Sequence, residues 1–176
     1  MRSAVNPGRR RTSERELLPT AADLGLGVVP WAPLGGGVLT GKYTTADLAT
    51  PGSDAPAGTR RDHAKANGTL TTRGLAIADA VFGVARQLGA TPAQVALAWT
   101  LRHPSVVSSL IGARTPEQLQ QNISALDVTL DESHLHTLHA ASDIDLGFPH
   151  EFLKRPVVRR VTTGHTTVRP RALRTR

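Results

Sequence analysis

The amino-acid sequence predicts an α/β fold with two short buried strands among several helices. Residues 26–32 are an apolar run without alternation that follows a helical pattern and Gly25. A strand buried on both faces of a parallel sheet has this character, and helix, glycine and buried strand in succession are typical of α/β proteins. Residues 105–111 form a second such run. Two parallel strands with a helical crossover make one right-handed βαβ unit with open edges, so the pattern indicates part of a larger structure.

Five segments with apolar residues every three to four positions predict helices. Residues typical of helix ends bound them: Gly25 and Gly89 close the first two, Thr-Pro pairs at Thr91 and Thr115 open the next two, and Asp131 begins the last. The strands are expected near 27–32 and 106–111, and the helices near 14–24, 73–88, 91–102, 115–125 and 131–142.

The remaining segments lack a lasting period. Residues 44–70 are rich in Thr, Ala, Pro, Gly and Asp and are expected to form a long loop, which in a compact domain is usually functional or disordered. We expect a basic N-terminal segment (1–12), a central domain (13–145) and a basic C-terminal tail (146–176), with both ends poorly ordered.

Composition and charge narrow the class of protein. The 176 residues include 21 Lys and Arg against 14 Asp and Glu, and the absence of Cys excludes disulfides, thiolate zinc sites and thiol nucleophiles. The positive charge lies at the two ends, whereas residues 16–153 are mildly acidic, so solvated ends are favoured over a nucleic-acid-binding arm. No run approaches the ~20 apolar residues of a membrane span, and a signal peptide is not seen. We therefore expect a cytoplasmic protein with no membrane partner.

The first candidate binding segment follows the first predicted strand, from Trp31 to Tyr43. Ligands of parallel α/β folds bind at the carboxyl ends of the strands. Three successive glycines, Gly35 to Gly37, would let the backbone approach a ligand and direct N–H groups at an anion, and Lys42 would add a positive charge. The alternative interpretation is a plain flexible turn.

The second candidate segment follows the second predicted strand, from Ile111 to Asn122. A helix beginning at Thr115 offers free N–H groups to a phosphate, and Arg114 could clamp that phosphate. Gln118 and Asn122 share one helix face and could bond a base or a ribose. Alternatively, Gln118 only completes the helix cap and Asn122 is solvated.

Metal binding is not expected. His134, His136 and His139 are clustered on the last predicted helix, but residues two apart on a helix point in different directions. We expect them to lie on a solvated face.

The two candidate segments, in this order, resemble the aldo/keto reductase family. The run from Glu14 to Pro19 and the run GLGVVPWAPLGGGVLTGKY from Gly25 are similar to the sixth helix, the seventh strand and the following loop of that family. TPAQVALAW from Thr91 and IGARTPEQL from Ile111 are similar to the end of its barrel, and GFPHEFL from Gly147 to its tail. The similarity extends over residues 13–168.

The resemblance implies a (β/α)8 TIM barrel, of which this chain is expected to be an incomplete C-terminal portion with strands 7 and 8 and the surrounding helices. It also implies hydride transfer between NADP(H) and an aldehyde, ketone or alcohol. Lys42 would approach the cofactor phosphates and Arg114 the 2′-phosphate. The cofactor-binding residues carried over by position are Trp31, Ala32, Pro33, Leu34, Gly35, Lys42, Gly112, Arg114, Gln118, Gln121 and Asn122.

The residues expected to perform catalysis are not found. The family's catalytic Asp, Tyr, Lys and His lie in the first half of its barrel, which residues 1–12 do not resemble, and Lys42 and Tyr43 are not substitutes. We therefore expect negligible carbonyl reduction and at most weak NADP(H) binding. Open strand edges predict self-association or a complementing chain that supplies the N-terminal half-barrel. The alternative is a non-enzymatic interaction module whose basic termini bind nucleic acid or a partner chain.

Overall fold

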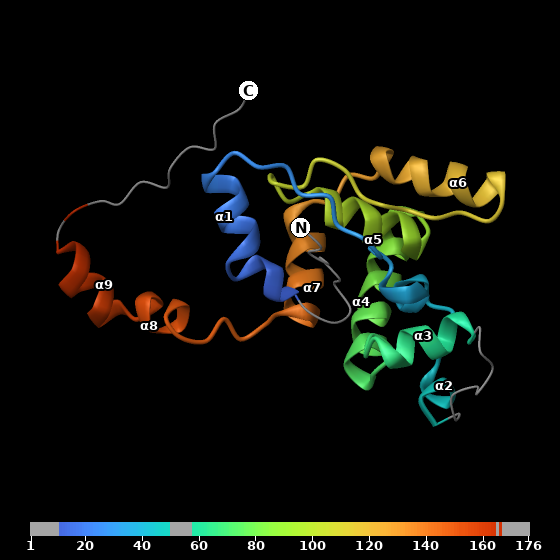
Figure 1. The fold of residues 1–176 in the computed structure, drawn as a ribbon, viewed down its shortest axis with the longest axis horizontal. Helices are drawn as coiled ribbons and strands as arrows, with labels where there is room; N and C mark the ends of the chain where they lie inside the picture. Colours follow the sequence, from blue (N-terminus) through green and yellow to red (C-terminus); the bar gives the residue numbers. More distant parts are fainter. Residues whose placement is uncertain (1–10, 50–57, 165, 167–176) are drawn as a thin grey trace.

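Three helices, α4 (Thr72–Leu88), α5 (Pro92–Leu101) and α7 (Glu132–Ser142), pack together at the centre of the protein. The computed structural model describes residues 11–49, 58–164 and 166, and Figure 1 shows their arrangement. The short 3-10 helix η2 (Gly35–Thr40) adds Val38 and Leu39, both fully buried, to the same core. Burying a side chain of this size contributes about 1.5–3 kcal/mol relative to leaving it exposed. The core therefore depends mainly on helix packing.

Local capping explains where the central helices begin and end. Thr91 and Gln94 form a reciprocal capping box at the start of α5, in which the Gln94 Oε1 atom accepts from the Thr91 N–H at 2.8 Å. Gly89 ends α4 in the left-handed conformation with φ 62°. The other two predicted helices are α1 (Leu17–Asp23), which η1 (Arg11–Glu14) precedes, and α6 (Pro116–Ile123), which η3 (Ser124–Asp127) follows. All five predicted helices are thus confirmed within a few residues.

The two predicted strand segments lie side by side and parallel, but they pair only at isolated bridges, Val28 with Val106 and Trp31 with Leu110. The Val28 N–H donates to the Ser105 carbonyl at 2.7 Å. In the described part of the chain neither segment forms a continuous strand, which corrects the strands expected near 27–32 and 106–111. Pro30 has no N–H to give, and no further strand supports either outer edge in the described residues.

The loop expected over residues 44–70 is wrong for the described part of that segment. Helix α2 (Thr45–Ala49) and helix α3 (Arg60–Ala66) lie within it, and residues 50–57 fall outside the described residues. A capping box between Thr59 and Asp62 begins α3. Helices of five to seven residues are too short to show a hydrophobic period, so the sequence pattern did not predict them.

The C-terminal tail also contains helices that the sequence did not predict, α8 (His150–Lys154) and α9 (Pro156–Thr163). The segment leading to them is held on the body, since the Arg15 side chain donates to the Asp145 carbonyl at 2.8 Å and Arg73 donates to the Asp143 carbonyl. Figure 1 shows α8 and α9 at the end of the molecule opposite α3 and α6. The expectation that both ends are poorly ordered is wrong for the described part of the tail, which forms these two helices. Residues 1–10, 165 and 167–176 lie outside the described part.

Candidate anion and cofactor site

The glycine segment after Trp31 forms an ordered turn. The Gly35 N–H donates to the Ala32 carbonyl at 3.0 Å, and the Gly37 N–H donates to the Leu34 carbonyl at 2.9 Å. Ala32 has a φ of 53°, which is unusual for a residue with a side chain. Because two of the three glycine N–H groups are bonded within the turn, the expected cradle of glycine N–H groups around an anion does not form here.

Lys42 returns from the end of this turn and lies across Gly37. An ideal Cβ atom on Gly37 would lie 2.7 Å from the Lys42 Cε atom and 2.8 Å from its Nζ atom. Gly37 has a φ of 93°, so it needs glycine for its backbone as well as for this close approach. The Nζ atom also lies 4.9 Å from the centre of the Tyr43 ring. These contacts hold the ammonium group beside the turn.

Two further cations act on Lys42. Partial burial lowers the pKa of the Lys42 ammonium, and the positive charges of Arg60 and Arg114 lower it further. Lys42 follows η2, Arg60 begins α3 and Arg114 precedes α6, so positive charges from three separate parts of the sequence act on one another here. Among the described residues, no ion pair joins any of the three to a carboxylate. Cations that form no ion pair with a carboxylate are suited to a bound anion.

The N-terminus of α6 offers fewer free groups for binding an anion than its sequence predicts. The Gln118 Oε1 atom accepts from the Arg114 N–H at 2.9 Å, and the Thr115 hydroxyl accepts from the Gln118 N–H at 3.3 Å. The capping interpretation of Gln118 is therefore the one that the structure adopts. A hydrogen bond from its own backbone N–H, with a second from Thr115, lowers the pKa of the Glu117 carboxyl. This carboxylate lies where an anion at the helix N-terminus would bind.

The remaining predicted cofactor residues divide by exposure. Trp31 presents an exposed side chain beside the turn, whereas Pro33 is buried and Leu34 packs against the core. Ala32 is half-buried and Gly35 is buried, so these two could meet a ligand only through the backbone. At α6, Gly112 and Gln121 are exposed and Asn122 is half-buried. The predicted cations Lys42 and Arg114 are thus available to a ligand, whereas the side chains of Pro33 and Leu34 face the protein interior.

Arg60 is the cation that sequence reasoning missed. The predicted loop over residues 44–70 gave no reason to single it out. The Thr59–Asp62 capping box was the available signal, because it marks a helix start and places Arg60 at the first helical position. No group of three His, Cys, Asp or Glu residues that could hold a metal occurs in the described part of the chain. His139 instead packs beside Trp99, with ring centres 6.0 Å apart.

The sequence profile of the aldo/keto reductase family matches residues 3–143. This chain belongs to the aldo/keto reductase family. The match covers most of the described structure, including Lys42, Arg60 and Arg114. It begins before residue 13, where the resemblance was expected to start, and ends before the expected limit of 168.

Curated relatives support the same assignment. The chain is 40% identical over 129 residues to "Uncharacterized oxidoreductase YrpG" of Bacillus subtilis, covering 73% of this chain and 36% of that protein. It is 34% identical over 134 residues to "Probable aldo-keto reductase 1" of Glycine max, covering 76% and 37%. It is 38% identical over 120 residues to a "Putative voltage-gated potassium channel subunit beta" of Schizosaccharomyces pombe, covering 65% and 33%. The chain thus spans about a third of the length of these relatives. Among the described residues, no helix combines the length and apolar character needed to cross a membrane.

Proposed function

We propose that this chain forms the phosphate-binding portion of an NADP(H)-dependent aldo/keto reductase, within an incomplete (β/α)8 barrel. The observation that carries the proposal is the close approach of the Lys42 ammonium group to Gly37, together with the positive charges of Arg60 and Arg114, which lie near enough to lower the pKa of Lys42. NADP(H) carries a pyrophosphate and a 2′-phosphate, and a group of cations that form no ion pairs is suited to such a ligand. When bound, the nicotinamide of this cofactor supplies or accepts the hydride.

The three cations have different chemical roles in this proposal. Lys42 is a point charge held at the turn and acts on the pyrophosphate. Arg114 offers a planar fork and binds the 2′-phosphate, which distinguishes NADP(H) from NAD(H). Arg60, at the first position of α3, adds a further positive charge that acts on Lys42. Trp31 is the exposed ring that covers the nicotinamide side of the turn.

We expect that the chain alone does not catalyse carbonyl reduction. Carbonyl reduction needs an acid that protonates the carbonyl oxygen, and losing general acid–base help costs ~10²–10⁴-fold in rate. It also needs a site that holds the nicotinamide and the carbonyl in reacting geometry. The experiment is to mix the chain with NADPH and 4-nitrobenzaldehyde and follow the nicotinamide absorbance, with a full-length aldo/keto reductase as the positive control. Turnover at about 1 s⁻¹ or faster, which is ordinary for an enzyme, would show that the chain does contain catalytic residues.

The partner in this proposal is the rest of an aldo/keto reductase barrel. Large apolar side chains are exposed along the paired segments and on α6 and η3, where the sequence predicts an inward face: Val29, Trp31, Val107, Leu110, Leu119, Ile123 and Leu126. The paired segments have unsupported outer edges, which is a template for further strands. An exposed apolar surface of this extent marks an interaction site, and the chain aligns with only about a third of the length of its relatives.

Trp31 provides the readout for this partner. The chain is mixed with the portion of the Bacillus subtilis relative to which it does not align, and tryptophan emission is recorded. Because Trp99 is already buried, a shift to shorter wavelength would come from Trp31, and Trp31→Phe should remove it. We expect the shift together with a 1:1 complex on size-exclusion chromatography. Unchanged emission and separate elution would contradict the partner.

A further inference from the structure

The C-terminal helices present apolar side chains to solvent. Phe148 is 83% exposed, Val157 is 65% exposed and Val161 is 80% exposed. Val157 and Val161 are four residues apart and therefore lie on the same face of α9. Phe152 and Leu153 of α8 are exposed beside them in sequence. Neither helix has a buried residue, so this apolar stripe gains little from packing within the chain.

Positive charges occupy the other side of the same helices. On α9, Arg159 falls on the face opposite Val157 and Val161 at 100° per residue, and Arg160 lies at the flank between these two faces. Lys154 and Arg155 add two more cations where α8 meets α9, and the Arg155 guanidinium lies 5.9 Å from the centre of the Phe152 ring. Glu151 is the one acid of residues 146–176 in the sequence, against eight Lys and Arg. The pair α8–α9 is thus amphipathic and strongly basic.

The position of the pair leaves its faces accessible. The chain reaches α8 through a segment fixed to the body by Arg15 and Arg73, and Figure 1 shows α8 and α9 at one end of the molecule, away from the cationic site. An apolar stripe beside cations requires a partner that is apolar and anionic together. The edge of a bilayer with anionic headgroups offers both, with acyl chains for the valines and phosphates for the arginines.

We propose that α8 and α9 lie on the surface of an anionic membrane. Val157 and Val161 enter the boundary between headgroups and acyl chains, and Lys154, Arg155, Arg159 and Arg160 bind lipid phosphates. Nucleic acid is a poorer partner, because exposed valines neither pair with phosphates nor stack on bases. The sequence predicts no membrane partner because no segment can span a bilayer, but an amphipathic helix in the interface does not need to span. This proposal is independent of cofactor binding.

Vesicle sedimentation with the full chain tests it. Vesicles of phosphatidylcholine with phosphatidylglycerol are compared with phosphatidylcholine alone at 0.1 M salt. We expect sedimentation with the anionic vesicles, and weakening of about tenfold in the doubly substituted V157N/V161N chain and in the doubly substituted R159Q/R160Q chain. Leu24→Asn is the matched control, since Leu24 is an apolar residue 65% exposed and outside α8 and α9, and it should bind as the parent does. Circular dichroism verifies that each variant is folded.

Three outcomes would overturn the proposal. The first is an absence of sedimentation with anionic vesicles. The second is binding that V157N/V161N leaves unchanged, because the attachment would then be a general effect of the basic tail. The third is binding of a duplex DNA probe that is tighter than vesicle binding and depends on Arg159 and Arg160 but not on the valines, which would assign the surface to nucleic acid.

Discussion

Lys42 lies across Gly37, so closely that a methyl group on Gly37 would occupy the space of the lysine side chain. The backbone of the glycine turn therefore determines where the Lys42 ammonium group lies. Gly37 permits both its own left-handed backbone and the return path of Lys42. The three consecutive glycines therefore place a cation, whereas the sequence suggested that they contact the anion themselves.

Substituting Gly37 should separate these two effects. Gly37→Ala forces a side chain into the left-handed region, which costs about 1–2 kcal/mol, and displaces the Lys42 ammonium group. Gly41→Ala is the matched control, since Gly41 has a φ of 75° but a Cβ atom added there would meet nothing within 4 Å. We expect similar losses in urea unfolding for both variants and weaker NADPH binding, by fluorescence titration, for Gly37→Ala alone. Equal losses of NADPH binding would show that Lys42 placement is irrelevant.

The lowered pKa of Lys42 predicts how cofactor binding depends on pH. A bound phosphate favours the charged ammonium, so affinity should be greatest below the pKa of the free protein's Lys42 and should fall as pH rises through it. Since this pKa is lowered, the fall should begin below the pH at which an ordinary lysine titrates. NADPH titrations from pH 7 to pH 10 measure it. Lys42→Arg carries a guanidinium that stays charged, and it should flatten the profile; a profile unaltered in Lys42→Arg would assign the titration to another group.

Removing the carboxylate of Glu117 should strengthen cofactor binding. This carboxylate accepts hydrogen bonds from its own backbone N–H and from the Thr115 side chain, close to Arg114 in sequence, and it holds a negative charge where the proposed phosphate binds. Glu117→Gln should raise the affinity for NADPH by about two- to fivefold. The exposed Glu132, in the first turn of α7, gives the control Glu132→Gln, with no expected change. An equal or weaker affinity in Glu117→Gln would place the phosphate elsewhere.

The capping box of α5 should matter for stability and not for binding. Thr91→Ala removes the hydroxyl that accepts from the Gln94 N–H and should lower the free energy of unfolding by about 1 kcal/mol. Thr129→Ala, at an exposed loop position, is the control. Denaturation by urea measures both. A loss in Thr91→Ala no greater than in Thr129→Ala would mean that α5 is held by its buried faces alone.

Features set by neighbouring residues were predictable from the sequence. The capping residues Thr91, Thr115 and Asp131 each begin a helix, because the cap is a contact between residues three apart. The parallel pairing of the two apolar runs was predictable as well. Arg60 was not, since its place beside Lys42 depends on two short helices without a hydrophobic period.

Burial was the least predictable property. Phe82, Leu119 and Ile123 fall on the apolar faces of their helices, yet each is exposed in the described structure. Periodicity identifies which side of a helix is apolar, but another part of the polypeptide must cover that side. The same reason explains the isolated bridges, because a strand pair without neighbours has little to hold it in register.

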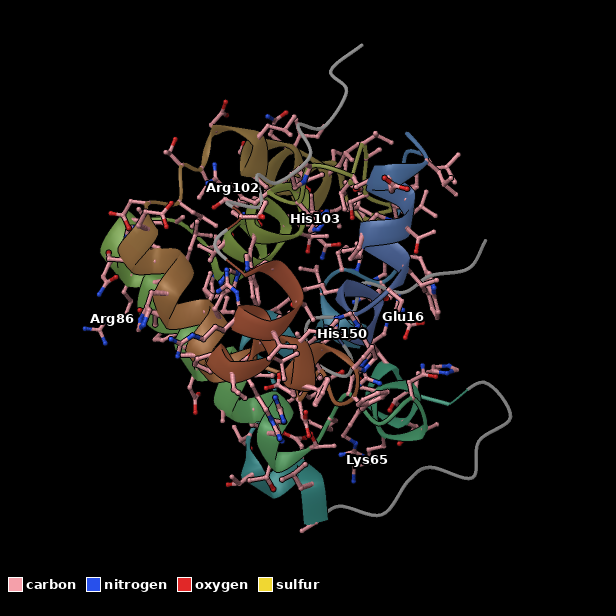
Figure 2. The ribbon with its side chains drawn as sticks, turned by 90° about the vertical axis from the view of Figure 1, so that its left-hand side faces the viewer. Glu16, Lys65, Arg86, Arg102, His103 and His150 are labelled. Carbon is pink, nitrogen blue, oxygen red and sulfur yellow. The ribbon has the colours of Figure 1, made fainter. Side chains whose placement is uncertain are left out.

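The preference for NADPH over NADH tests the central claim most directly. The two cofactors differ only in the 2′-phosphate that the proposal assigns to Arg114, so calorimetric titration of both into the same protein isolates that contact. We expect about tenfold tighter binding of NADPH, and loss of this preference in Arg114→Gln. Arg86→Gln, which alters an exposed arginine pointing outward from α4 (Figure 2), should keep it. Equal affinities in the unaltered chain, or a preference that survives in Arg114→Gln, would contradict a cofactor-phosphate site built on this cluster.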